Sequence, residues 1–312
     1  MNSPHISKSN NDIFYDDHQN NDYPVNIYYI DLAQMVMGDV QIHWHDQIEI
    51  DYIKMGNAVF KIGQTDIPLH EGEAVLINGG RIHSIHSAGS DECIILSVLI
   101  SPDFIFDKKD SFLSLKYRNL GDNDSYMLYH KFPANDTSNI NLINNILKAN
   151  LEKTFGYELT TKGNICQLWL NLIYSNGNDK YKANSQQIFD EERTKKAIAY
   201  IHRNYMKDIS LEELSESIHL SKSECCRSFK RATQMTPFEY LLRQRIFESA
   251  VKMQKNDPIS NSINRLSIAV GFNNASYYNK IFKKYIGQTP SKSKEMLKRS
   301  HRDSLSPFGI PI

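Results

Sequence analysis

The sequence predicts a multidomain α+β protein with an N-terminal β-barrel or double-sheet domain, a helical segment and a C-terminal all-α domain. Between residues 23 and 105, apolar and polar residues alternate and turn residues recur at short intervals. From residue 140 the apolar spacing becomes helical, and residues 209–290 hold two copies of one helical pattern. A chain of 312 residues is long enough for two domains with sizeable cores.

The N-terminal part is predicted to be a β domain over residues 23–138, after a polar tail at 1–22. Period-two patterning predicts strands at 41–45, 49–54, 58–62, 74–77 and 93–100. Glycine-containing turns separate them at 56–57, 63–64, 71–72 and 79–80. Many short strands with such turns are typical of a barrel or a two-sheet domain. Residues 106–138 are predicted to be a loop region with short elements.

Residues 139–187 are predicted to be a helical segment and a linker. Ile143, Leu147, Leu151 and Phe155 recur every fourth position, which predicts one amphipathic helix. A second helix follows, with Ile165, Trp169, Leu172 and Ile173 on one side. The two helices pack either on the β domain or on a second copy of the chain. Residues 176–187 have linker composition.

Residues 188–300 are predicted to form the all-α domain, followed by a tail at 301–312. In the first copy of the pattern, Ser210 and Glu213 form a capping box before a short helix, and Ser221 with Glu224 repeats this device. In the second copy, Gly271 makes the turn between a helix at 263–270 and one at 274–285. A helix at 237–254 joins the copies, and it would be about 27 Å long. Two helices joined by a tight turn form a helix-turn-helix unit, whose second helix enters the major groove of DNA.

The second helix of each unit carries a stripe of side chains able to donate hydrogen bonds to bases or phosphates. Cys225 and Phe229 are predicted to face the core of the first unit, and Tyr278 and Phe282 that of the second. The predicted DNA-contacting residues are Ser223, Cys226, Arg227 and Lys230 in the first unit, and Ser276, Asn279, Lys280, Lys283 and Lys284 in the second.

Charge is distributed unevenly along a chain whose net charge is zero. Residues 191–312 hold 22 Lys and Arg against 12 Asp and Glu, whereas residues 1–190 hold 14 against 24. The C-terminal part therefore has a surplus of ten positive charges, as binding to phosphates requires.

The C-terminal third resembles the DNA-binding domain of the AraC family of bacterial transcription regulators. The resemblance is carried by Phe229-Lys230, Thr236-Pro237-Phe238, Val270-Gly271-Phe272, Ile281-Phe282-Lys283-Lys284-Tyr285 and Gly287-Gln288-Thr289-Pro290. The chain departs from the family pattern at Glu224-Cys225-Cys226, at Ser228 and at Arg265-Leu266-Ser267. Because Cys and Ser bury less apolar area than Leu, the changes in the first unit predict a thinner core under the first recognition helix. The resemblance implies a sequence-specific DNA-binding regulator that is a homodimer, with promoter DNA and a small-molecule effector as partners and RNA polymerase as a further candidate.

The β domain resembles the cupin fold through His43-x-His45, Glu49, Gly56, Gly72 and His83. In metal-binding cupins the positions of His43, His45, Glu49 and His83 hold the metal, and three imidazoles with a carboxylate suit a transition metal. The resemblance to AraC-type sensors implies the alternative, in which the same residues line a metal-free ligand pocket. Trp44 and Tyr52 are candidates for stacking against a sugar ring, with burial in the core as the alternative.

The cysteines and the hydropathy predict a cytoplasmic protein. Cys93, Cys166, Cys225 and Cys226 show no spacing typical of a metal site or a redox pair, so reduced thiols are expected. No stretch is apolar enough for a membrane span or a secretion signal.

Together these patterns predict a regulator, and not an enzyme, whose cupin-like barrel binds an effector and whose double helix-turn-helix binds DNA. No cofactor is expected unless the histidines hold a transition metal. Two alternatives remain open: a metal-dependent cupin enzyme with an appended DNA-binding domain, and a DNA-binding protein that responds to no ligand.

Overall fold

The structure is a computed structural model that describes residues 23–89, 92–118, 126–175, 180–183 and 185–303. The predicted N-terminal tail, residues 304–312 of the predicted C-terminal tail and part of the predicted linker lie outside these ranges. The chain divides into two compact units, one formed by residues 1–192 with 231–234 and the other by residues 193–230 with 235–312. Each unit is described by itself.

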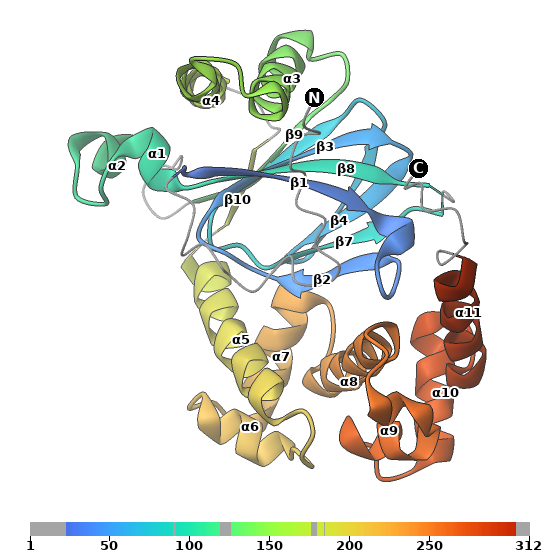
Figure 1. Cartoon of the computed structure of the whole chain (residues 1–312). Coiled ribbons are helices and arrows are strands. Elements are labelled where there is room, and N and C mark those ends of the chain that lie inside the picture. Colours follow the sequence, from blue (N-terminus) through green and yellow to red (C-terminus); the bar gives the residue numbers. More distant parts are fainter. Residues whose placement is uncertain (1–22, 90–91, 119–125, 176–179, 184, 304–312) are drawn as a thin grey trace. The chain divides into compact units, whose positions relative to one another are not determined.

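The first unit is built on two antiparallel sheets (Figure 1). The larger sheet has the order β1-β8-β3-β6-β9-β10 and the smaller one β2-β7-β4-β5. The strands are β1 (Val25–Asp31), β2 (Asp39–His43), β3 (Ile48–Met55), β4 (Asn57–Ile62), β5 (Thr65–His70), β6 (Ala74–Ile77), β7 (His83–Ser87), β8 (Ile94–Ile100), β9 (Tyr126–Phe132) and β10 (Lys180–Ala183). The predicted two-sheet β domain is therefore confirmed.

Several strands differ from the predicted ones. The strand expected at 41–45 begins and ends two residues earlier, as β2. β1 and β5 have no predicted counterpart. Pro68 argued against a strand at β5, but it is tolerated there because β5 lies at the edge of its sheet. β9 and β10 occupy segments predicted to be loop and linker, and they pair with each other at the edge of the larger sheet.

Two cores lie on opposite faces of the larger sheet because side chains alternate along each strand. Ile53, Val75 and Ile95 belong to the core that also contains residues of the smaller sheet, such as Phe60 and Leu69. The intervening residues of the same strands face a second core that the helices α3 (Thr137–Glu152) and α4 (Tyr157–Tyr174) cover.

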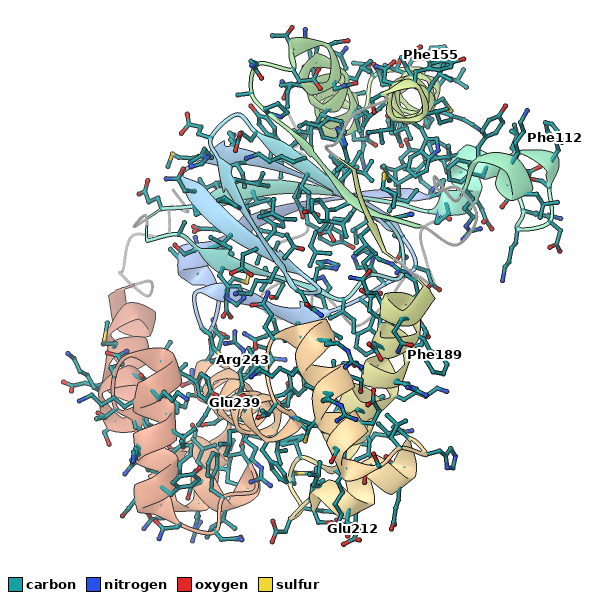
Figure 2. The ribbon with its side chains drawn as sticks, turned by 180° about the vertical axis from the view of Figure 1, so that it is seen from behind. Phe112, Phe155, Phe189, Glu212, Glu239 and Arg243 are labelled. Atoms are coloured by element: carbon teal, nitrogen blue, oxygen red, sulfur yellow. The ribbon has the colours of Figure 1, made fainter. Side chains whose placement is uncertain are left out.

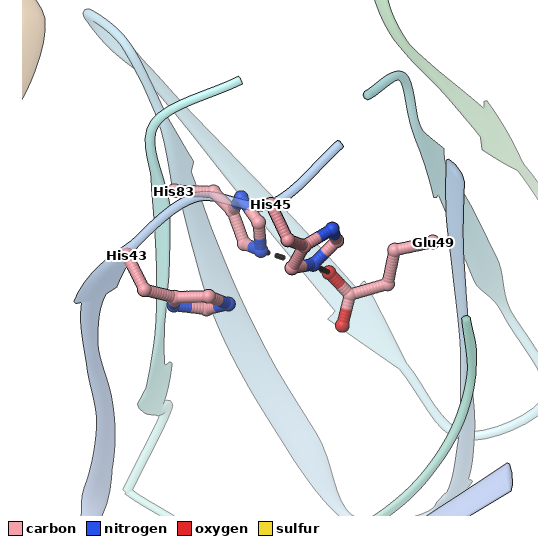
Figure 3. Close-up of side chains that lie close together, drawn as sticks. All are labelled: His43, His45, Glu49 and His83. Atoms are coloured by element: carbon pink, nitrogen blue, oxygen red, sulfur yellow. Dashed lines mark hydrogen bonds and ion pairs between the residues drawn. The ribbon is translucent and has the colours of Figure 1, made fainter. Parts of the chain in front are cut away.

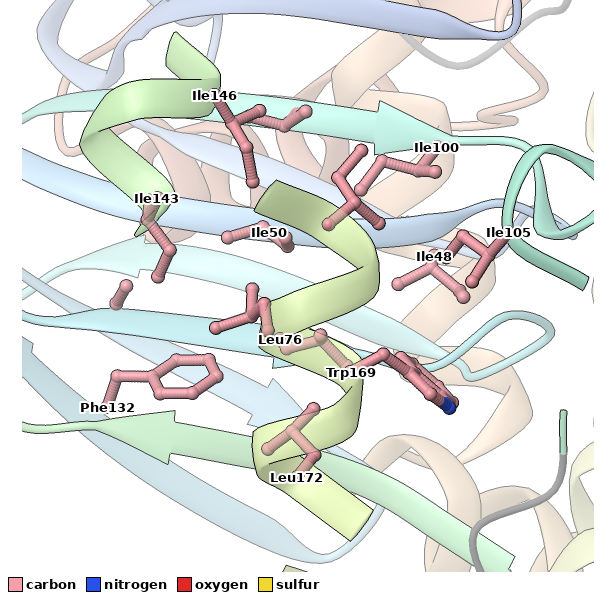
Figure 4. Close-up of a cluster of buried hydrophobic side chains, with 14 of the residues drawn as sticks. Ile48, Ile50, Leu76, Ile100, Ile105, Phe132, Ile143, Ile146, Trp169 and Leu172 are labelled. Carbon is pink, nitrogen blue, oxygen red and sulfur yellow. The ribbon is translucent and has the colours of Figure 1, made fainter. Parts of the chain in front are cut away.

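Figure 4 shows how α3 and α4 cover this sheet face. Ile143 and Ile146 of α3 and Trp169 and Leu172 of α4 lie over the strands, where all four are buried. The indole nitrogen of Trp169 donates to the carbonyl of Tyr117, at the end of α2 (Phe112–Tyr117), which follows α1 (Pro102–Phe106). The predicted packing of these helices on the β domain is thus observed.

One residue of the predicted α3 stripe does not belong to it. α3 ends at Glu152, Lys153 adopts a left-handed conformation, and Phe155 lies beyond the helix with its side chain fully exposed (Figure 2). The period of four continued in the sequence after the helix had stopped, so the expectation for Phe155 was wrong.

The second unit and the residues around it are helical. The helices are α5 (Ser185–Asn204), α6 (Leu211–Ser217), α7 (Lys222–Thr233), α8 (Pro237–Gln254), a short 3-10 turn (Pro258–Asn261), α9 (Ile263–Ala269), α10 (Ala275–Ile286) and α11 (Pro290–Asp303). The predicted capping box of Ser210 and Glu213 is present before α6, and a second one joins Thr236 and Glu239 before α8. α5 begins earlier than predicted, and α11 extends three residues past the predicted end of the domain.

At the start of α7 the Ser221 hydroxyl accepts from the Glu224 backbone N–H, as expected. The Glu224 carboxylate also forms an ion pair with Arg227. Among the described helices, none is long and apolar enough to cross a membrane.

Candidate nucleic-acid interface and ligand site

The first helix-turn-helix unit consists of α6 and α7, joined by a turn in which His219 adopts a positive φ of 55°. Cys225, Ser228 and Phe229 of α7 are buried, so this face of the helix is fixed by packing. The Phe229 ring meets the Tyr240 ring of α8 edge-on, with 5.6 Å between centroids. The opposite face of α7 carries the predicted DNA-contacting residues. Ser223, Arg227 and Lys230 are exposed and Cys226 is half-buried.

An acidic partner engages Arg227 on this face. The guanidinium lies 2.7 Å from the carboxylate of Glu224, one turn earlier on α7, in an exposed ion pair. Exposed pairs of this kind contribute about 0–1 kcal/mol, so the guanidinium can exchange its partner at low cost. A phosphate or base that binds Arg227 can therefore replace Glu224 as its partner.

The second unit consists of α9 and α10, joined by a turn at Gly271. Gly271 has a φ of 90°, and a Cβ placed on it would lie 2.6 Å from the carbonyl oxygen of Tyr205. No other residue type fits this turn without moving the backbone. Tyr278 and Phe282 of α10 are fully buried, as predicted. The predicted contact residues on the opposite face are all exposed: Ser276, Asn279, Lys280, Lys283 and Lys284.

α8 supports both recognition helices. Tyr240 near its start packs against Phe229 of α7, and Ser249, nine residues later, hydrogen-bonds through its hydroxyl to Tyr278 of α10. Nine residues correspond to about 13.5 Å along a helix. The carbonyl of Glu239 also accepts from the Tyr285 hydroxyl, at 3.3 Å. Both recognition helices are thus anchored to the same helix, α8.

Arg245 of α8 is a connecting residue that the sequence did not reveal. Its side chain donates to the carbonyls of Tyr205 and Lys207, both at 2.7 Å, and its guanidinium lies over the Phe272 ring, 5.6 Å from the centroid. Burial lowers the pKa of Arg245. Arg245 thus connects the loop before the first helix-turn-helix with the turn of the second one. The sequence did not reveal this role, because a basic residue in a helix is usually expected to face solvent.

In the first unit of the chain, four polar side chains from both sheets converge (Figure 3). His43 ends β2, His83 begins β7, Glu49 lies in β3 and His45 follows β2. One potential ligand atom from each lies within 4.8 Å of all the others. The sequence predicted these four residues. The predicted strand at 41–45 held both His43 and His45, whereas β2 ends at His43 and a bend at 46–47 precedes β3.

Backbone carbonyls hold all three rings in one tautomer. Each Nδ1 lies within hydrogen-bonding distance of a carbonyl oxygen: His43 of Gln41 at 2.8 Å, His45 of Gln47 at 3.1 Å and His83 of Arg81 at 2.8 Å. A carbonyl oxygen can only accept, so each Nδ1 carries a proton. In a neutral ring, Nε2 then presents a lone pair to the centre of the cluster.

The carboxylate of Glu49 faces two of these nitrogens. Its Oε2 lies 3.0 Å from Nε2 of His45 and 2.8 Å from Nε2 of His83, and its Oε1 accepts from the Ser97 hydroxyl at 2.9 Å. Lone pairs at such distances repel unless a cation lies among them, either a proton on a ring or a metal ion. Nδ1 anchored to carbonyls and a hydrogen-bonded carboxylate are the usual surroundings of metal ligands. The four residues therefore fit a divalent transition metal.

Ionisation of the cluster is set by burial and by neighbouring charges. Burial would raise the pKa of Glu49, but His83 and hydrogen bonds from His45 and His83 hold it well below the usual range. Burial, followed by the charge of His83, lowers the pKa of His43 well below its ordinary value. Asp51, two residues after Glu49, is fully buried, and burial together with the Glu49 charge raises its pKa well above normal.

The two aromatic candidates do not join this cluster. Tyr52 packs against the core under α3 and α4, on the sheet face opposite to Glu49, so of its two alternatives the structure shows packing in the core and not stacking on a sugar. Trp44 is half-buried beside His43 and His45 in the chain, and its predicted role stays a prediction.

Comparison with known proteins identifies the two parts. Residues 34–132 match the family model of an AraC-like ligand binding domain, and residues 214–296 match that of a helix-turn-helix domain. The chain is therefore a DNA-binding transcription regulator with an N-terminal ligand-binding domain. More specifically, it belongs to the AraC family of transcription regulators.

Similar proteins cover nearly the whole chain. The HTH-type transcriptional regulator YdeC of Bacillus subtilis (strain 168) is 29% identical over 283 residues, which are 90% of this chain and 94% of YdeC. YdiP of Escherichia coli (strain K12), another HTH-type transcriptional regulator, is 23% identical over 279 residues, 86% of each chain. The crystal structure of ToxT from Vibrio cholerae O395 aligns with 88% of this chain and 97% of its own, at 15% identity and a TM-score of 0.42.

Proposed function

We propose that the exposed faces of α7 and α10 enter consecutive major-groove segments of one DNA duplex. The observation that carries this proposal is the attachment of both helices to α8, through Phe229 with Tyr240 and through Tyr278 with Ser249. α8 is about 27 Å long, which is of the order of the roughly 34 Å between successive major-groove faces. Arg227 and Lys280 are the principal candidates for base or phosphate contacts.

The remaining residues on these faces divide by chemistry. Ser223, Cys226, Ser276 and Asn279 have short side chains suited to base edges, whereas Lys230, Lys283 and Lys284 suit phosphates. RNA polymerase remains a candidate partner, and a cytoplasmic location remains a prediction that follows from the need to reach DNA.

Footprinting on a promoter fragment tests this arrangement. Two protected segments about one helical turn apart on one face of the duplex are expected for each protein chain. A single protected segment, unchanged by Lys280→Ala, would mean that α10 does not enter a groove.

We further propose that the chain is a homodimer joined through α4. The buried side of α4 packs on the sheet, yet a second apolar stripe lies on its exposed side. Leu159, Gly163, Cys166, Leu170 and Tyr174 recur at i, i+4, i+7, i+11 and i+15. Leu159 is 77% and Tyr174 72% exposed, and Gly163 in the middle allows another helix to approach closely. Two copies of this stripe can pair about a two-fold axis.

Cys166 supplies a built-in probe of this pairing. It is exposed, whereas Cys93 and Cys225 are buried. In a Cys226→Ser background, a short bifunctional maleimide should join two chains through Cys166, and Cys166→Ser should abolish the product. Leu170→Lys should give a monomer in sedimentation. A dimer unaffected by Leu170→Lys would place the interface elsewhere.

A third proposal concerns the role of the β domain, which we infer to be regulatory and not catalytic. The histidine cluster binds a divalent transition metal, and the ligands would be His43, His45, Glu49 and His83. The supporting observation is that one potential ligand atom from each of the four residues lies within 4.8 Å of the others, while each Nδ1 is held by a carbonyl. A metal here supplies a positive charge that can orient a bound effector.

Metal analysis of tag-free protein tests this reading. About one equivalent of metal per chain is expected in the wild type and much less in Glu49→Gln, with thermal stability raised by added metal only in the wild type. Metal-free wild-type protein that zinc, nickel and manganese do not stabilise would favour the alternative of a metal-free ligand pocket. Turnover of a substrate that is lost in His45→Ala would instead favour a metal-dependent enzyme.

A further inference from the structure

The β domain contains a cavity whose lining includes none of the four residues of the histidine cluster. Its volume is about 140 Å³, and Asp46, Asn78, Gly79, Arg81, Arg118 and Met127 are among the residues that line it. A cavity of about 150 Å³ accommodates a molecule the size of benzene. The space therefore suits a ligand with roughly six to nine non-hydrogen atoms.

Its charged lining is unusual for this part of the chain. Residues 1–190 contain only two arginines, Arg81 and Arg118, and both line this cavity. Among the residues that line it, Asp46 is the acidic one, and it is exposed. Guanidinium groups bind carboxylates in a planar, bidentate manner, so two of them around one small space favour an anion.

The rest of the lining indicates which kind of anion fits. Ile48, Pro102 and Met127 provide an apolar surface. The backbone N–H groups of Gly79 and Gly80 are already bonded, to the Asn78 side chain and to the carbonyl of His45. Polar recognition is thus left to the two guanidinium groups, and the apolar wall suits a hydrocarbon body.

Both arginines have an internal carboxylate as partner. Arg118 pairs with Asp103 at 3.4 Å, in an exposed contact. Arg81 lies 2.9 Å from Glu191, and this pair is largely buried, with side-chain exposures of 13% and 5%. Glu191 belongs to α5, and the backbone carbonyl of Arg81 also orients the His83 ring. Arg81 therefore connects the cavity with α5 and with the histidine cluster.

We propose that this cavity binds a small, compact carboxylic acid and that its carboxylate competes with Glu191 for Arg81. The inference rests on the proposed function of the β domain as a regulatory ligand-binding domain, and it names the ligand class and the switch. A carboxylate between Arg81 and Arg118 releases Glu191, and with it the restraint on the first turns of α5. Without the acid, Glu191 is the carboxylate that pairs with Arg81.

Calorimetry on the full-length protein tests the proposal, with cyclopentanecarboxylate as the probe. Its neutral amide, cyclopentanecarboxamide, is the matched control ligand, and inorganic phosphate tests whether any anion suffices. We expect the carboxylate to bind at least tenfold more tightly than the amide or phosphate. Arg118→Gln should weaken carboxylate binding at least tenfold, and Lys131→Gln, a basic residue of the same domain that does not line the cavity, should leave it unchanged.

Glu191→Gln distinguishes competition from simple binding. Removing the internal carboxylate should tighten binding of the probe about fivefold or more, whereas a merely structural Glu191 would leave it unchanged or weaken it. Equal binding of acid and amide, no binding of the acid, or no effect of Arg118→Gln would overturn the proposal. DNA binding of the same proteins is measured in parallel without the probe. If the calorimetry gives one of these results while DNA binding persists, only the ligand assignment fails. If the wild type does not bind DNA, the proposed DNA interface fails whatever the calorimetry gives.

Discussion

The hydrogen bond between Ser249 and Tyr278 offers a sharp test of how the second recognition helix is held. Both side chains are fully buried, and burial raises the pKa of Tyr278, so its hydroxyl stays protonated. Ser249→Ala or Tyr278→Phe leaves the other hydroxyl buried without this partner, which costs about 1–3 kcal/mol. The double variant removes both groups, and its loss should be smaller than the sum of the single losses by about 0.5–3 kcal/mol.

Hydrogen exchange over residues 263–286 measures this effect locally. A loss of about 1–3 kcal/mol corresponds to exchange that is about 5- to 150-fold faster in the single variants. Trp44 and Trp169 both belong to the first unit, so the unfolding transition seen by tryptophan fluorescence should not change. Tyr277→Phe, at an exposed position next to Tyr278, is the control. Strictly additive losses in the double variant would refute the proposed support of α10 by α8.

Three further predictions concern the same domain. Glu224→Gln frees Arg227 and removes a negative charge from the DNA face, so DNA affinity should rise about 1.5- to 5-fold at low salt and not at high salt in an anisotropy titration. Burial lowers the pKa of His202 in the folded protein to about 4. Below a pH of about 6.5, His202 is therefore protonated in the unfolded chain but still neutral in the folded protein. Stability should therefore fall by up to about 3 kcal/mol as the pH drops toward 4, and denaturant titrations of His202→Gln should lack this component. Gly271→Ala places a Cβ against the Tyr205 carbonyl in a strained backbone conformation. It should therefore lower the free energy of unfolding by about 1–3 kcal/mol and weaken DNA binding. A melting curve identical to that of the wild type would contradict this.

The double helix-turn-helix could be predicted in detail because its signals are local. Ser210 with Glu213, Pro237 after Thr236, and Gly271 each mark a helix boundary by backbone chemistry alone. The exposed and buried faces of α7 and α10 follow from helical spacing. Arg245 could not be found in this way, because its role depends on two carbonyls some forty residues away.

The β domain was less predictable because strand pairing is a long-range property. The alternation of apolar and polar residues is weak in β9 and β10. They form strands because β9 pairs with the edge of β6 and β10 then pairs with β9. The histidine cluster was predicted as a set, yet its geometry depends on a bend at 46–47, where a single Asp without Gly or Pro did not suffice to predict that β2 ends at His43. Ser97 and Asp51, which complete its surroundings, come from strand positions where a small or polar residue usually faces solvent.

The proposed pair of recognition helices is tested most directly by the salt dependence of DNA binding. Affinity for a promoter fragment is measured between about 50 and 200 mM salt for the wild type, Arg227→Ala, Lys280→Ala and the control Lys148→Ala in α3. Arg227→Ala and Lys280→Ala should each weaken binding and reduce the slope of log affinity against log salt by about one, while Lys148→Ala matches the wild type. Binding independent of salt, or a slope that neither Arg227→Ala nor Lys280→Ala changes, would contradict the entry of α7 and α10 into the DNA grooves.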